Sequence, residues 1–323
     1  MTYSADILRQ ARRALEEKKT AHEAAQQARL QEIYEKLPRV REIDRQLRVN
    51  MAQAAQAAFS RETADPLARA RAENLALQAE RKALIAGAFS PEYLHDGPVC
   101  DKCGGSGYVG SAMCACLAEL CCQEQKKALS LLSAGDNAFA DFRLDFYPDR
   151  VDPKHGVSPR AIMARNFDIC KKYAGEFSAA GGNLLLNGST GLGKTMLSAC
   201  IARVVTEKGF SVAYESAPHL FAKLESNHFR PDEETRLAVA PFRSCDLLII
   251  DDLGTELPGN FVTAALYTLI NDRLLAGKPM IISTNLTIGE IRERYSPQIA
   301  SRLQGSFQLL PFLGEDIRVL KNK

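Results

Sequence analysis

The sequence predicts an α/β protein, in which a mostly parallel sheet has helices on both faces and follows a helical region and a small cysteine-rich module. Three observations support this prediction. Between residues 183 and 284, short apolar runs alternate with segments of helical periodicity. Residues 1–86 contain no glycine and are rich in strong helix formers. Residues 87–116, in contrast, contain clustered glycines and paired cysteines.

Length and composition limit the possible functions. The 323 residues have room for two or three domains, and the formal net charge of +2 means that any nucleic-acid contact must come from a local patch. No apolar stretch approaches the roughly 20 residues of a membrane span, and the charged N-terminal segment is unlike a signal peptide. We therefore expect a cytoplasmic protein without a membrane partner, whose nine cysteines serve as thiols or metal ligands.

The helical region is expected to cover residues 1–90. Pro38 and Pro66 are its only prolines before residue 86, and they divide it into three helices, expected at residues 4–37, 39–63 and 66–86. Two interpretations of this region remain open. It is either an arm that docks a partner protein, or a plain helical spacer or weak coiled coil.

The cysteine-rich module is expected at residues 91–125 and holds two close pairs of cysteines separated by a glycine-rich segment, namely Cys100, Cys103, Cys114 and Cys116. Four thiolates at this spacing suit tetrahedral Zn²⁺, which would supply much of the folding energy of so small a module. Cys121 and Cys122 follow on a helical pattern and could compete as ligands. A linker at 126–140 then leads into a domain at 141–323.

A glycine-rich loop stands between the first expected strand, 183–187, and the first expected helix of this domain, 195–208. Its residues are Gly188, Ser189, Thr190, Gly191, Leu192, Gly193, Lys194 and Thr195. Such a loop turns its backbone N–H groups and the start of the helix toward phosphate oxygens. The lysine can reach the β- and γ-phosphates, and the Thr195 hydroxyl can ligate Mg²⁺. The sequence therefore predicts that a nucleoside triphosphate binds here.

Strands and helices alternate after the loop, with strands expected at 210–215, 246–250 and 279–284 and helices at 217–228 and 260–276. Polar residues stand where two of these strands end. We expect Asp251 to hold Mg²⁺ and Asp252 to orient and activate the attacking water, with Glu256 as a second candidate for the latter role. Asn285 can reach the γ-phosphate or the same water.

Three segments together resemble the core of AAA+ ATPases, namely residues 188–195, 247–254 and 282–285. The segments 299–303 and 314–318 are similar to those of the DnaC/DnaI-type replicative helicase loaders and of the related IstB-type transposition helper ATPases. The resemblance covers about residues 141–323. It implies an AAA+ P-loop fold and an ATPase that converts ATP and water to ADP and phosphate.

The resemblance also implies roles for two arginines. Arg302 would act in trans on the ATP of a neighbouring chain, and Arg318 would contact the γ-phosphate in cis. Two features depart from the family pattern. Asp252 stands where most AAA+ proteins have Glu, and Arg318 is followed by only five residues, so we expect the helical lid to be absent or vestigial.

The cysteine module resembles the helicase-binding domain of Gram-positive loaders. This implies a hexameric replicative DNA helicase as partner. The role in trans that the family resemblance implies for Arg302 in turn implies self-association through ATP-bridged head-to-tail contacts. The resemblance further implies single-stranded DNA binding, for which Phe221 and Lys223 are candidates. Two alternatives remain: an IstB-type transposition helper ATPase, and an ATP-gated adaptor with little turnover.

Overall fold

The computed structural model describes residues 3–59, 64–90, 93, 97–130, 138–153 and 156–320. The chain divides into two compact units, one formed by Met1–Arg13 with Ala115–Lys323 and the other by Ala14–Cys114. Within the described ranges, every helix is too short or too polar to cross a membrane. The expected domain boundaries near residues 90, 125 and 140 stay predictions, and residues 131–137 of the expected linker lie outside the described part.

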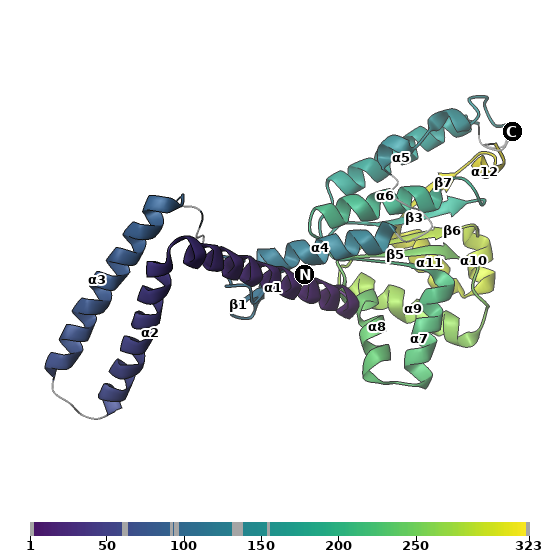
Figure 1. Ribbon diagram of the computed structural model, residues 1–323. Coiled ribbons are helices and arrows are strands. Elements are labelled where there is room, and N and C mark those ends of the chain that lie inside the picture. The colour runs from purple at the N-terminus through teal and green to yellow at the C-terminus, as the bar shows by residue number, and fades with distance from the viewer. Residues whose placement is uncertain are drawn as a thin grey trace. The chain divides into compact units, whose positions relative to one another are not determined.

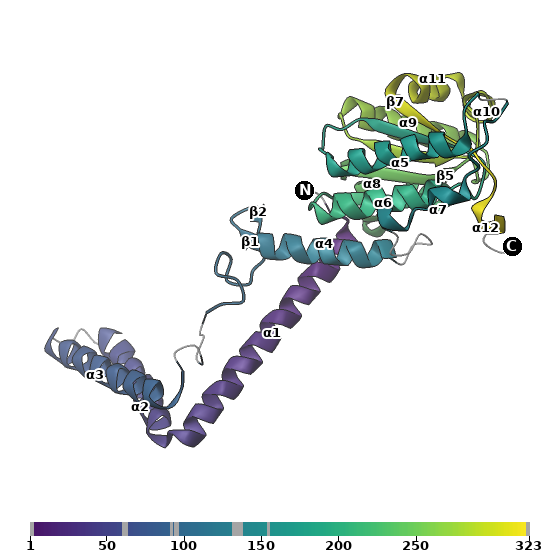
Figure 2. The same cartoon turned by 90° about the horizontal axis from the view of Figure 1, so that it is seen from above.

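The N-terminal residues form three long helices, as predicted, which are α1 (Ala5–Lys36), α2 (Pro38–Phe59) and α3 (Ala64–Ala88). α2 and α3 lie side by side as a hairpin (Figures 1 and 2). A small apolar cluster of Ile33, Val40 and Ile85 stabilises the base of the hairpin. Residues 60–63, which were expected to end the second helix, lie outside the described part.

The glycine-rich segment forms a short antiparallel hairpin of β1 (Tyr108–Val109) and β2 (Ala112–Met113). Gly110 turns the chain between these strands with φ at 61°, a conformation that L-residues with a side chain rarely adopt. The helix α4 (Ala115–Ser130) follows directly. The cysteines at 100, 103, 114 and 116 therefore flank one tight hairpin.

The core of residues 141–320 is a five-stranded parallel sheet in the order β4-β5-β6-β3-β7, and the parallel α/β fold predicted from the sequence is confirmed. Its strands are β3 (Asn183–Gly188), β4 (Val212–Ser216), β5 (Leu247–Leu253), β6 (Met280–Thr284) and β7 (Phe307–Phe312). Strand β3, which precedes the glycine loop, lies near the middle of the sheet. Strands β4 and β7 form its two edges.

Helices cover both faces of this sheet (Figure 1). One apolar cluster joins the sheet to α5 (Pro159–Gly175) and α6 (Lys194–Glu207). A second cluster joins the opposite face to α7 (Ala217–Phe229), α8 (Glu233–Ser244), α9 (Asn260–Leu275), α10 (Ile288–Arg294) and α11 (Pro297–Ser306). The short elements are η1 (Phe139–Asp141), η2 (Leu144–Phe146) and α12 (Ile317–Leu320).

The interior strand β5 shows why the sheet needs two apolar faces. Leu247 and Ile249 belong to one cluster, whereas Leu248 and Ile250 belong to the other. This alternation follows from the two-residue period of a strand, and burial on both faces explains its continuous apolar run. The register with β6 is irregular between Ile250 and Leu253, and this irregularity contains the two adjacent aspartates.

Candidate functional site

The glycine loop connects the carboxyl end of β3 to the first residue of α6, Lys194. Two of its glycines are required by the geometry. A Cβ on Gly188 would lie 2.3 Å from the carbonyl oxygen of Phe312, on the neighbouring strand. Gly193 caps the helix with φ at 85°, and a Cβ there would lie 3.1 Å from both Phe142 and Tyr147. Neither position accepts a larger residue without displacing its neighbours.

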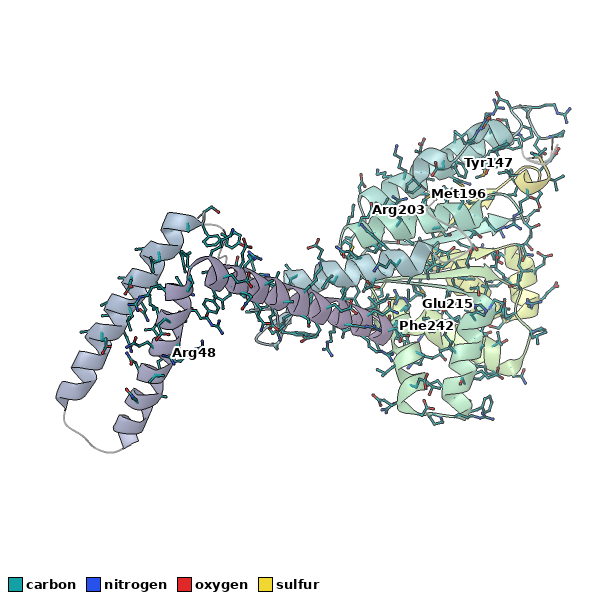
Figure 3. All side chains as sticks on the ribbon, in the orientation of Figure 1. Arg48, Tyr147, Met196, Arg203, Glu215 and Phe242 are labelled. Atoms are coloured by element: carbon teal, nitrogen blue, oxygen red, sulfur yellow. The ribbon has the colours of Figure 1, made fainter. Side chains whose placement is uncertain are left out.

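An aromatic group supports the outer side of the loop. Tyr147 is almost fully buried, and its hydroxyl donates to the carbonyl oxygen of Leu192 at 2.9 Å. Its ring stacks on Phe142 with the centroids 5.8 Å apart (Tyr147 is labelled in Figure 3). The segment before α5 therefore fixes the loop from outside.

Lys194 is buried, and its ammonium group donates to the carbonyl oxygens of Gly188 and Ser189 at 2.6 and 2.7 Å. Burial lowers the pKa of Lys194, while the charges of Asp252 and Asp251 act in the opposite direction. Within the described ranges this lysine forms no ion pair. A buried ammonium group that is bonded only to carbonyls fits an anionic ligand such as a phosphate.

Asp251 is 5% exposed and lies at the carboxyl end of β5. Both of its carboxylate oxygens accept hydroxyl groups. Tyr214 of β4 donates to Oδ2 at 2.8 Å, and Ser283 of β6 donates to Oδ1. Because both donors are neutral hydroxyl groups, they do not neutralise the buried negative charge of Asp251. Such a carboxylate fits a divalent cation.

Asp252 has φ at 55°, the only non-glycine residue with positive φ among those described. Its N–H donates to the Ser283 hydroxyl at 2.9 Å, and Thr255 donates twice to its carbonyl oxygen. The residue is exposed as a whole, yet desolvation of its carboxyl group and then the like charge of Asp251 raise its pKa. The charges of Lys194 and Arg318 oppose this shift.

Glu256, the second candidate for acting on water, is 5% exposed and fully engaged. It accepts the N–H of Gly254 at 2.9 Å and the hydroxyl of Tyr295, and Arg294 Nε lies 3.6 Å from its carboxylate. Glu256 therefore fastens the loop after β5 to the end of α10. Of the two candidates for acting on water, Glu256 and Asp252, only Asp252 influences the charge of Lys194.

The C-terminal segment reaches the glycine loop as well. The N–H of Ile317 donates to the Gly191 carbonyl at 3.1 Å, and the Asp316 carboxylate lies directly against Gly191. Arg318 is close enough to influence the charged groups of Lys194 and Asp252. Asn285 is exposed at the end of β6 and lies beside Gly254, next to the segment of Asp252.

Arg302 lies elsewhere, on α11. Its guanidinium group donates to the Tyr267 hydroxyl at 2.7 Å and to the Asn271 amide oxygen at 2.9 and 3.2 Å. It also lies 4.4 Å from the centroid of the Tyr267 ring. These contacts fix Arg302 on α9 of its own chain, and the structure does not bring it to the glycine loop.

The two candidate DNA-binding residues have other partners. Phe221 is 3% exposed and belongs to the sheet core, so its ring offers no face on which a base could stack. Lys223 forms an ion pair with Glu215.

An exposed aromatic group that sequence reasoning missed lies at the end of α7 and the start of α9, where Phe229 is 65% exposed and His228 and Phe261 lie beside it. The two adjacent aromatic residues His228 and Phe229 could have indicated this group in the sequence.

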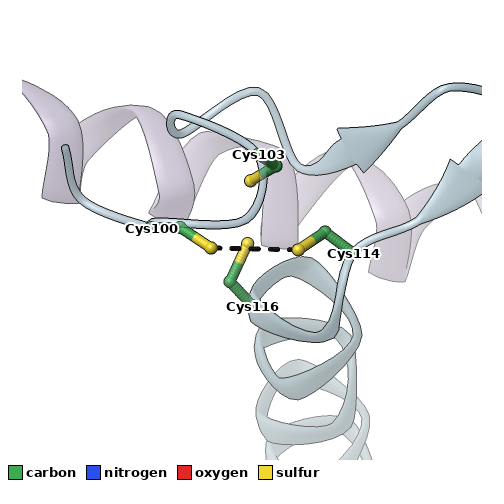
Figure 4. A group of neighbouring side chains, drawn as sticks. All are labelled: Cys100, Cys103, Cys114 and Cys116. Carbon is green, nitrogen blue, oxygen red and sulfur yellow. Dashed lines mark hydrogen bonds between the residues drawn. The ribbon is translucent and has the colours of Figure 1, made fainter.

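The four cysteines converge, as Figure 4 shows, with their sulfur atoms all within 4.8 Å of one another. The sulfurs of Cys100 and Cys114 are 3.8 Å apart, which is the edge of a tetrahedron with metal–sulfur bonds of about 2.3 Å. The Gly107 N–H donates to Cys103 Sγ at 3.3 Å, a contact of the kind that stabilises a metal-bound thiolate. The donor set and spacing therefore fit Zn²⁺.

Cys121 and Cys122 do not join this cluster. Burial raises the pKa of Cys121 to about 11, and this thiol is completely buried on α4. The Cys122 thiol donates to the Thr206 carbonyl oxygen at 3.1 Å. Both thiols therefore serve the packing of α4.

Part of the chain that carries the glycine loop is similar to known proteins. Residues 169–301 match the family model described as IstB-like ATP binding protein. A putative ATP-binding protein in an insertion sequence of Mycobacterium tuberculosis is 27% identical over 33% of this chain and 41% of its own length. A putative insertion sequence ATP-binding protein of Sinorhizobium fredii is 33% identical over 35% of this chain and 37% of its own length.

The replicative helicase loader DnaI of Bacillus subtilis is 25% identical over 42% of this chain and 43% of its own length. The chain thus spans about two fifths of the length of these curated relatives. Among solved structures, the DnaC helicase loader is 20% identical with a TM-score of 0.45, over 54% of this chain and 98% of that chain. DnaI is 18% identical with a TM-score of 0.43, over 56% and 90% respectively.

Proposed function

We propose, on the premise that residues 169–301 form an IstB-like ATP-binding domain, that this chain binds ATP with Mg²⁺ and hydrolyses it to ADP and phosphate. The observation that carries the proposal is the convergence of three charged groups at the carboxyl edge of the sheet. Lys194 at the start of α6 bonds to the loop carbonyls, Asp252 lies in the irregular end of β5, and the segment of Arg318 bonds to the loop through the Ile317 N–H. The electrostatic influence of these three groups on one another agrees with this placement. Opposite charges on separate elements at the end of a glycine loop suit phosphoryl transfer.

The loop and Asp251 would bind the nucleotide. Backbone N–H groups of residues 188–195 would bind the phosphates, Lys194 would bring its charge to the β- and γ-phosphates, and Thr195 and Asp251 would ligate Mg²⁺. When bound, Mg²⁺ neutralises part of the negative charge on the phosphate oxygens. The adenine would lie near the aromatic group of Phe142 and Tyr147.

Asp252 would orient the attacking water and accept its proton. Its raised pKa makes its carboxylate a better proton acceptor than an ordinary aspartate. Asn285 lies beside the same segment and would hold the water or a γ-phosphate oxygen. Arg318 would contact the γ-phosphate from within the chain.

Arg302 would complete the site of a neighbouring chain. Because it lies on α11 and is fixed to α9, it would reach a nucleotide only across a contact between two chains. A head-to-tail contact of this kind repeats into a ring or an open spiral. ATP would then bridge the subunits.

The biological role that we propose is that of a replicative helicase loader. The cysteine cluster and the helices before it would dock a hexameric helicase, and Zn²⁺ would stabilise the docking module. The ATPase domain would bind single-stranded DNA, with Lys223 as the remaining candidate contact, and hydrolysis would time release. The similarity to DnaI supports this role.

A transposition helper is the second candidate, and the two relatives from insertion sequences favour it. An adaptor that uses ATP only as a switch is a third. Genomic neighbours separate the first two, since a loader gene is expected beside replication genes and a helper gene beside a transposase gene.

Steady-state ATP turnover of the full chain, with and without single-stranded DNA, tests the ATPase proposal. We expect Mg²⁺-dependent turnover in the wild type and its loss in Lys194→Ala, with weakened ATP affinity in the variant. Lys208→Ala, which changes a lysine at the other end of the same helix, is the matched control and should keep its turnover. Absence of turnover in the wild type under all these conditions would favour the adaptor.

A further inference from the structure

Two hydroxyl groups hold the carboxylate of Asp251 from opposite sides. Strand β5 lies between β4 and β6, and each neighbour contributes one hydroxyl. Tyr214 reaches across from β4 to Oδ2 at 2.8 Å, and Ser283 reaches from β6 to Oδ1. Because each oxygen accepts a bond from a different strand, the plane of the carboxylate is fixed and cannot rotate without breaking a hydrogen bond.

We propose that Tyr214 and Ser283 are positioning residues that orient Asp251 for Mg²⁺. The inference rests on the proposed function and deepens it, because it names the groups that shape the metal site. Neither residue would touch the nucleotide. Both would act through Asp251, as outer hydrogen-bond donors commonly do at metal-binding carboxylates.

The neutrality of both donors is the chemical reason for this assignment. A lysine or arginine hydrogen-bonded to Asp251 in place of these hydroxyl groups would neutralise its charge and compete with a cation. A hydroxyl group orients a carboxylate without removing that charge, and each carboxylate oxygen keeps a further lone pair for a metal. Since Asp251 is 5% exposed, water cannot replace either donor freely.

Tyr214 lies on an edge strand, and its position is stabilised from outside the sheet. Gln125 of α4 donates to the Val212 carbonyl oxygen at 2.8 Å on the open side of β4. Just before the strand, the Ser211 N–H and hydroxyl group donate to the Asp246 carboxylate at 2.8 and 2.7 Å. The tyrosine therefore extends from a fixed backbone.

Ser283 has a second contact that Tyr214 lacks. Its oxygen accepts the N–H of Asp252 at 2.9 Å, where the backbone has the positive φ of 55°. Ser283 thus links the Mg²⁺ carboxylate to the residue that we assign to the water. The two positions should consequently give different kinetic signatures when their hydroxyl groups are removed.

Tyr214→Phe in the full-length chain tests the inference by Mg²⁺ titration of turnover at saturating ATP. We expect the Mg²⁺ concentration for half-maximal turnover to rise about 10-fold, with maximal turnover recovered at high Mg²⁺. Affinity for ATP in excess chelator should be unchanged, because the tyrosine does not touch the nucleotide. Tyr173→Phe is the matched control, since its hydroxyl donates to the Gly182 carbonyl at 3.0 Å, away from the aspartates.

Ser283→Ala provides the second signature. We expect the same direction of change in Mg²⁺ dependence, together with a fall in maximal turnover that added Mg²⁺ does not recover. Unchanged Mg²⁺ dependence in both variants, with wild-type thermal stability, would overturn the inference while leaving the ATPase proposal intact. If the wild type binds ATP but does not hydrolyse it, the proposed hydrolysis fails. The Mg²⁺ dependence of ATP affinity then tests the positioning role in the same variants.

Discussion

Arg302 donates two hydrogen bonds to the amide oxygen of Asn271, from Nε at 3.2 Å and from Nη2 at 2.9 Å. The planar guanidinium group is thereby fixed in direction on the surface of α9, and the nearby Tyr267 ring supports it at 4.4 Å. An arginine that is held in this way loses little side-chain entropy when it meets an anion on a neighbouring chain. This relationship leads to the first prediction.

Arg302→Ala should bind ATP as the wild type does but lose hydrolysis, by about 10³–10⁵-fold for an arginine supplied in trans. Mixing it with Lys194→Ala should restore part of the activity, because one mixed interface combines an intact loop with an intact arginine. The measurement is ATP turnover of each variant alone and of the mixture. Arg292→Ala, an exposed arginine on the adjacent α10, is the control. Full turnover in Arg302→Ala alone would contradict the role in trans.

Asp252→Asn should separate binding from catalysis. The amide keeps the size of the side chain but cannot accept a proton from water, so we expect normal ATP affinity and a turnover lowered by about 10²–10⁴-fold. Equilibrium binding and single-turnover hydrolysis measure the two quantities. Turnover at the wild-type rate would assign the water to another group.

Glu256→Gln is the structural counterpart of that change. Because its carboxylate accepts bonds from Gly254 and Tyr295, the substitution should lower the free energy of unfolding by about 1–3 kcal/mol. Turnover per folded molecule should fall far less than in Asp252→Asn. Chemical denaturation and turnover, measured on the same preparation, test this contrast. A loss of turnover as large as that of Asp252→Asn without a loss of stability would give Glu256 the catalytic role.

One Zn²⁺ per chain should be found in protein purified without chelator. Cys103→Ser should lose the metal and unfold the small module, while ATP affinity is largely kept because the α/β region has its own core. Cys122→Ser, whose side chain bonds to Thr206 outside the cluster, should keep the metal. Elemental analysis measures the zinc content of the wild type and both variants, and equilibrium binding measures their ATP affinity. A metal-free wild type would contradict the assignment.

Much of the α/β region follows from local patterns. The run from Asn183, the glycine loop and the helix that begins at Lys194 form the order in which phosphate loops are built, and their bounds agree with the structure to within a residue. Strand β7 was missed because Gln308, Pro311 and the preceding Gly305 interrupt its apolar run. Helix α8 contains Pro241 near its end, which weakened its helical signal.

The surroundings of the candidate site could not be predicted, because they depend on contacts between distant residues. The engagement of Glu256 is due to Tyr295, and the burial of Phe221 is due to the sheet face beneath α7. The hydroxyl groups on Asp251 come from two other strands. Sequence spacing identifies the carboxylates but not the groups that orient them.

Association with the replicative helicase of the same host tests the loader proposal most directly. The measurement is co-elution of the full-length chain with the helicase hexamer in size-exclusion chromatography, in ATP and in ADP. We predict co-elution in ATP that weakens after hydrolysis, and its loss in Cys103→Ser but not in Cys122→Ser. A wild-type chain that hydrolyses ATP yet elutes apart from the helicase under all these conditions would contradict the account and favour the transposition helper.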